Sequence, residues 1–165
     1  MNRRTLLLSL AGAASAASIA RAQPLLPTNP GQFRLTMLMS GEYAIATSRI
    51  ALERSRNPHI RNFAQLEINE QTAVAAALGA ASGTVQPRPD QIAIIQRLQG
   101  LPAGRSFDRA YVEGQIAGHE ELLALNMAYA QSGGDDRGRA VATVAVPSIQ
   151  THLSILSKML RNGVA

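Results

Sequence analysis

The chain has 165 residues, of which 46% are hydrophobic, 16% are charged and 4% are aromatic. This length and apolar content predict one globular domain and exclude a disordered chain. There is no Cys, which excludes disulfides, thiolate metal sites, iron–sulfur clusters and a Cys nucleophile.

Residues 1–22 have the pattern of a secretory signal peptide. Two arginines precede an apolar stretch that ends at Ala20, and Ala20-Arg21-Ala22 has the small-x-small form of a cleavage site. The stretch is shorter than the roughly 20 strongly apolar residues of a membrane span, so we expect no stable span once the signal is removed. We therefore expect a periplasmic protein that begins at Gln23, exported by the Sec or the twin-arginine route.

The charge and the motifs of the chain exclude several function classes. Cleavage after Ala22 would remove three arginines and lower the formal net charge from +5 to +2. Binding of nucleic acid needs a clustered basic face with stacking aromatics, so we expect no nucleic-acid partner. The sequence contains no G-x-S-x-G, P-loop, dinucleotide fingerprint or H-E-x-x-H motif. It therefore indicates no catalytic residues and no substrate, and leaves open whether the protein is an enzyme.

Two Asn-Pro pairs mark the first helices. Residues 23–32 are a proline-rich lead-in to a helical domain over residues 33–165. Asn29-Pro30 and Asn57-Pro58 each combine a preferred cap with a preferred first helical residue. They predict one helix that ends near Ser55 and a second that starts almost at once, which forces an antiparallel hairpin.

The second half of the chain predicts another hairpin. Residues 82–105 carry Gly and Pro around a short helical piece from Gln91 to Gln99, which indicates a long crossover. A third helix is predicted from the candidate cap Ser106 to about Gln131, and a fourth from Asp135-Asp136 to about residue 162, with Pro147 expected to kink or divide it. Two hairpins joined by one long crossover predict an all-α, ferritin-like four-helix bundle.

Each long helix places an ionisable side chain on its own apolar stripe. The apolar stripe of the first helix includes Leu35 and Leu38. The stripes of the second, third and fourth helices include Phe63, Ile116 and Leu156, respectively. At helical spacing from these positions lie five candidate metal ligands: Glu42, Glu67, Glu70, His119 and His152.

The height of each candidate along the helices follows from its distance to the nearest turn, at 1.5 Å per residue. Glu42 and Glu70 should lie within roughly 3 Å of one level, so these carboxylates are expected to be able to meet. His119 and His152 differ by about 7 Å, a mismatch that a kink at Pro147 would reduce.

Two interpretations of this polar layer follow. Carboxylate oxygen with imidazole nitrogen is a ligand set for iron, manganese or zinc, so the layer is a candidate metal site. The alternative is a metal-free polar layer in a non-catalytic structural or interaction module of the cell envelope, in which Arg49 would pair with Glu67. Met37 and Met39, placed off the main stripe, would permit a homodimer.

The order and spacing of several short segments resemble a known family. Residues 33–162 are similar to the exported bacterial ferritin-like proteins grouped as domain of unknown function 4142. The resemblance implies an envelope location and a four-helix bundle, for a family without a settled activity. Many of its members carry His where this chain has Gln71. The matching segments are Glu42, Asn57-Pro58, Phe63-Ala64, residues 67–71 (EINEQ), residues 107–111 (FDRAY), His119, Pro147 and His152-Leu153.

Overall fold

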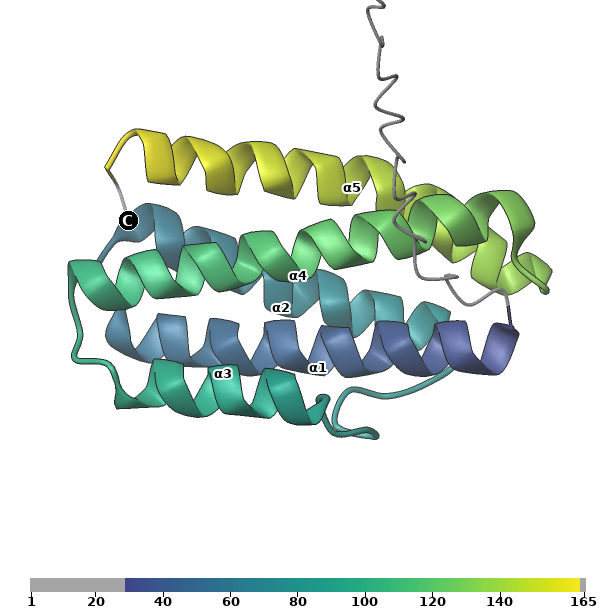
Figure 1. Ribbon diagram of the computed structural model, residues 1–165, viewed down its shortest axis with the longest axis horizontal. Coiled ribbons are helices and arrows are strands. Elements are labelled where there is room, and N and C mark those ends of the chain that lie inside the picture. Colours follow the sequence, from purple (N-terminus) through teal and green to yellow (C-terminus); the bar gives the residue numbers. More distant parts are fainter. Residues whose placement is uncertain (1–28, 164–165) are drawn as a thin grey trace, which may run out of the picture.

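The computed structural model describes residues 29–163, and all of its regular elements are helices (Figure 1). The predicted signal peptide and most of the lead-in lie outside the described residues. Within them the prediction of an all-helical protein is confirmed, with no strand. The five helices are α1 (Pro30–Arg54), α2 (Pro58–Ala77), α3 (Pro89–Gly100), α4 (Arg105–Ser132) and α5 (Asp136–Arg161).

Side-chain caps fix three of the helix starts. The side chains of Asn29 and Asn57 accept hydrogen bonds from backbone N–H groups in the first turns of α1 and α2, as predicted. Asp135 does the same for α5, accepting from the N–H of Gly138 at 2.8 Å. The prediction of Ser106 as a cap was wrong. α4 begins one residue earlier, after Gly104, whose φ of 131° is a conformation that glycine adopts readily.

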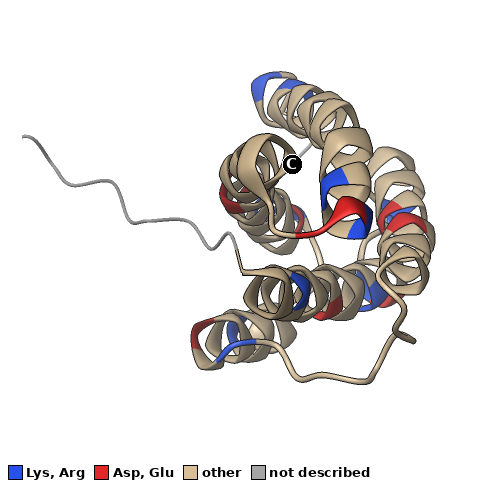
Figure 2. Ribbon diagram, turned by 90° about the vertical axis from the view of Figure 1, so that its right-hand side faces the viewer, with Lys and Arg blue, Asp and Glu red and all other residues tan. Residues whose placement is uncertain are grey.

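The four long helices lie side by side and α3 lies outside them (Figure 1). The short turn between α1 and α2 and the turn between α4 and α5 make two hairpins, and the connection between α2 and α4 contains α3. α3 packs on α1 and α4, while α1 also contacts α2, α4 and α5. Figure 2 views the helices end-on and shows that basic and acidic residues are both distributed over several helices.

The apolar core has two clusters. One contains Phe63, Phe107 and Leu156, and the other contains Phe33 and Tyr129, whose rings stack with their centroids 3.7 Å apart. Along α2, α4 and α5, the residues between the two clusters include buried polar side chains. The core is thus apolar at both ends and polar in the middle.

The predicted stripe of α1 was confirmed at Leu38, which is buried, and wrong at Leu35. Leu35 is 49% exposed, whereas Met37, placed outside the stripe, is buried in a core cluster. α1 contacts all four other helices and is buried on most of its circumference, so its apolar periodicity gives little information on direction. Met37 packs inside its own chain and therefore offers no surface for a homodimer.

α5 differs from expectation in two ways. It runs undivided through Pro147. In the described part of the chain it is also the one helix that is long and apolar enough to cross a membrane by length and composition. The sequence interpretation overlooked this property, which arises because residues 140–157 contain no Lys, Arg, Asp or Glu. The same helix packs on α4 and supplies His152 and Leu156 to the interior.

Candidate metal centre

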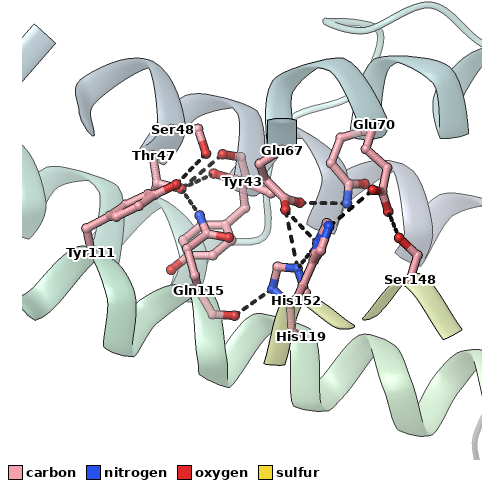
Figure 3. Close-up of polar contacts among 12 residues, drawn as sticks. Tyr43, Thr47, Ser48, Glu67, Glu70, Tyr111, Gln115, His119, Ser148 and His152 are labelled. Atoms are coloured by element: carbon pink, nitrogen blue, oxygen red, sulfur yellow. Dashed lines mark hydrogen bonds and ion pairs between the residues drawn. The ribbon is translucent and has the colours of Figure 1, made fainter. Parts of the chain in front are cut away.

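Three ionisable side chains from three helices meet in the middle of the core (Figure 3). They are Glu67 of α2, His119 of α4 and His152 of α5, called the core trio below. Their side chains are 0%, 3% and 4% exposed, respectively. Charged groups removed from water in this way need a compensating charge or ligand.

The facing atoms of the core trio form a nearly equilateral triangle. Glu67 Oε2 lies 3.3 Å from His119 Nε2 and 3.2 Å from His152 Nδ1. The two ring nitrogens lie 3.1 Å apart. All three atoms are of the kinds that coordinate transition metals, and this is the group of potential metal ligands found among the described residues.

The size of this triangle fits a metal ion. With edges near 3.2 Å, the point equidistant from the three atoms in their plane lies at the edge length divided by √3, about 1.9 Å from each. A zinc ion makes bonds of about 2.0–2.2 Å to such atoms, so an ion slightly out of the plane would reach all three. A tetrahedral ion with bonds of this length separates its ligands by about 3.3–3.6 Å, and the observed distances lie at or just below the short end of this range.

The other ring nitrogen of each histidine faces an acceptor. His119 Nδ1 lies 2.7 Å from the backbone carbonyl oxygen of Gln115 and can only donate to it. In the neutral ring, Nε2 of His119 therefore carries the lone pair that faces the core trio. His152 Nε2 lies 3.3 Å from Glu70 Oε2, which leaves Nδ1 of His152 to face the trio. Carbonyl and carboxylate partners of this kind orient metal-bound histidines in proteins.

The carboxylate of Glu67 has a hydrogen bond at one oxygen and none at the other. Gln71 Nε2 donates to Oε1 at 2.8 Å. Oε2 is buried and accepts no hydrogen bond of acceptable geometry, although two ring nitrogens are close to it. A buried carboxylate oxygen without a hydrogen bond is costly, and bound cations are one way to compensate it.

The pKa values of Glu67 and His152 are shifted in opposite directions. Burial alone would raise the pKa of Glu67, but the imidazoles of His119 and His152 lower it to about 2. Burial would likewise lower the pKa of His152, but the carboxylates of Glu67 and Glu70 raise it to about 9. Without a metal, the Glu67 carboxylate is therefore ionised and the His152 ring is protonated at neutral pH.

The structure brings four of the five predicted ligands together. Glu67, His119 and His152 form the core trio, and Glu70 contacts His152 from behind. Glu42 is separate from them: its side chain is half-buried and accepts a hydrogen bond from the backbone N–H of Gly83. No contact between Glu42 and Glu70 is found among the described residues.

The proposed bridge from Arg49 to Glu67 was wrong. Arg49 is exposed, and the neighbours of Glu67 are the two histidines and Gln71. The predicted mismatch of the histidines was wrong as well, since their facing nitrogens lie 3.1 Å apart.

The sequence analysis named Gln71 without its bond to Glu67, and it missed two further supporting residues, Gln115 and Ser148. Gln71 and Gln115 each lie four positions from the residue they hold, so helical i, i+4 spacing could have identified both. Ser148, whose hydroxyl donates to Glu70 Oε1 at 2.7 Å, comes from a different helix, and no sequence signal indicates it.

Comparison with known proteins places the chain in a family. No curated protein and no solved structure matches it. The model of the family described as "Domain of unknown function (DUF4142)" matches residues 14–159, which is most of the chain. The chain therefore belongs to the DUF4142 family, the one that its sequence resembles.

Proposed function

We propose that this protein is an exported, ferritin-like four-helix bundle that binds one transition-metal ion through Glu67, His119 and His152. Iron, manganese and zinc all accept one carboxylate and two imidazoles. The observation that carries the proposal is the triangle of ligand atoms in which Glu67 Oε2 faces two ring nitrogens without a hydrogen bond. Support for a ferritin-like bundle comes from the two hairpins and the long connection between them.

The number of protein ligands bears on what the ion could do. Three ligands leave at least one coordination position for water or another molecule, as in catalytic zinc sites, whereas structural zinc sites use four. Gln71 occupies Oε1 of Glu67, so the carboxylate offers Oε2 alone. The site is therefore suited to an ion that keeps an exchangeable ligand.

Elemental analysis of protein purified from the periplasm tests the proposal. We expect about one equivalent of one metal, either as isolated or after reconstitution with zinc, manganese or, without oxygen, ferrous iron. Less than a tenth of an equivalent under all these conditions would overturn metal binding.

Histidine variants test which side chains bind the ion. His119→Ala and His152→Ala should each lower the metal content, because each removes one of three ligands. His59→Ala is the matched control, since His59 is exposed at the start of α2 and should have no effect. Full metal content in both His119→Ala and His152→Ala would remove these residues as ligands.

A metal-free polar layer is the second candidate function. The observation in its favour is that a protonated His152 can donate from Nδ1 toward His119 Nε2 and from Nε2 toward Glu70. The layer would then set the register of the helices in a structural or interaction module. This candidate stands if no metal binds.

Export has its own test. The pattern of residues 1–22 supports cleavage after Ala22, so N-terminal sequencing of the mature protein should begin at Gln23. A protein that begins at Met1 in the cytoplasmic fraction would overturn export.

A further inference from the structure

A groove runs between α2 and α5 and ends at the group that surrounds the core trio. Its volume is about 450 Å³, and residues such as Ala73 and Ala77 of α2 and Val141 and Val144 of α5 line it. These side chains are small or medium in size, which leaves the groove open. Glu70 is its one ionisable lining residue.

Glu70 connects this groove to the core trio. Its side chain is 26% exposed, whereas those of the core trio are at most 4% exposed. Its Oε2 lies 3.3 Å from His152 Nε2, and its Oε1 accepts from Ser148, which also lines the groove. In Figure 3, Glu70 and Ser148 lie together on one side of the histidines.

Buried side chains adjoin the core trio elsewhere. Phe63 is buried and its ring lies edge-on to His152, with the centroids 5.2 Å apart. Gln71 and Gln115, which hold Glu67 and His119, are buried too. Of Glu70, Gln71, Gln115 and Phe63, Glu70 is the one that lines this groove.

The surroundings of Glu70 favour cations. Apolar walls strengthen the field of a carboxylate, and a cleft with one sign of charge raises the local concentration of ions of the opposite sign and their rate of binding. No Lys or Arg lines the groove. A divalent ion in the groove therefore meets the Glu70 carboxylate, and it must replace the proton of His152 to move on to the core trio.

We propose that the α2/α5 groove is the access route for the metal ion, and that Glu70 is the first side chain to bind the ion before it reaches Glu67, His119 and His152. This inference rests on the proposed metal site. It assigns Glu70 to the rate of loading, whereas the core trio determines whether metal is bound at equilibrium.

The rate of cobalt binding to the full metal-free protein tests this route. Co²⁺ can replace zinc, and its visible absorption reports coordination in a stopped-flow experiment. Ala73→Trp places a large side chain in the groove and should slow loading at least tenfold, with the final cobalt content unchanged. Ala76→Trp is the matched control: Ala76 is also exposed on α2 but does not line the groove, so its loading rate should equal that of the wild type.

Two further variants keep the test decisive. Val144→Trp fills the groove from α5, where Val144 is 72% exposed, and serves if Ala73→Trp fails to fold. Glu70→Gln preserves the shape of the side chain and removes its charge. It should slow loading at least tenfold while full occupancy is still reached at saturating cobalt.

The outcomes separate this inference from the proposed function. If the wild type binds neither cobalt nor zinc, manganese or ferrous iron, both fail. If the wild type binds cobalt and folded groove variants load as fast as Ala76→Trp, the route is wrong and the metal site stands. If Glu70→Gln alone loads at the wild-type rate, the role of Glu70 is wrong.

Discussion

Two buried polar clusters lie next to each other in the core and are built from different chemistry (Figure 3). The first is the core trio, which is charged. The second, called the hydroxyl cluster here, joins α1 to α4 through Thr47, Ser48, Tyr111 and Gln115, and all its members are neutral. Gln115 links the two clusters, because its side chain bonds Thr47 and its backbone carbonyl bonds His119.

The two clusters differ in how completely their buried polar atoms are hydrogen-bonded. In the hydroxyl cluster, the Ser48 and Tyr111 hydroxyls lie 2.9 Å apart, Gln115 Nε2 donates to Thr47 Oγ1 at 2.9 Å, and no buried side-chain polar atom lacks a partner. In the core trio, Glu67 Oε2 has no hydrogen bond and faces only the two imidazoles. Neutral groups can satisfy one another, whereas the trio depends on a proton or a metal ion for its charge balance.

The largest effect is expected from loss of the Glu67 charge. Glu67→Gln leaves protonated His152 without one of its two carboxylates, so the metal-free protein should lose roughly 3 kcal/mol in urea unfolding. Bound metal should fall below a tenth of an equivalent. Glu42→Gln is the matched control, because Glu42 lies outside the core trio, and its cost should stay below about 1 kcal/mol. A Glu67→Gln protein with wild-type stability and metal content would contradict the role given to the core trio.

An intermediate effect is expected from pH in the metal-free protein. The pKa of His152 is raised from 6.5 to about 9, so the stabilisation by its proton is complete below pH 6.5 and is lost as the pH rises through 9. Unfolding by urea at pH 6 and pH 9.5 should differ by an amount on the order of 1–3 kcal/mol. His152→Gln should flatten this dependence, and an unchanged pH profile in that variant would contradict the assignment.

The smallest effect is expected in the hydroxyl cluster. Tyr111→Phe removes the partner of Ser48 and should cost about 1–2 kcal/mol, with the metal content unchanged. In the double variant with Ser48→Ala, both polar groups are gone, and part of the loss should be recovered. Thermal unfolding and elemental analysis check both statements. Loss of metal in Tyr111→Phe would show that the two clusters are coupled more closely than their contacts indicate.

Local signals in the sequence predicted the helices well. The Asn-Pro pairs and Asp135 occur where the structure caps α1, α2 and α5, because caps depend on neighbours within one turn. Helical spacing also predicted that Glu67, His119 and His152 face inward, since α2, α4 and α5 each have a definite buried face.

Relations between helices were predicted poorly. Heights counted from turns assume parallel axes and ignore the reach of side chains, so they separated two histidines that are in contact. The predicted directions of Glu42 and Arg49 were wrong because α1 is surrounded by other helices, so its apolar residues do not indicate one buried face. The contact of Ser148 with Glu70 was not predicted because a contact between α5 and α2 produces no pattern within either helix.

The division of the core into two apolar ends has a consequence for unfolding. Each end, one around Phe107 and the other around Phe33 and Tyr129, has its own packed side chains. Bonds across the middle decide whether both ends melt as one unit or open separately. An ion bound by α2, α4 and α5 would cross-link the three helices in this layer. Its removal would allow one apolar end of the core to unfold while the other end stays folded.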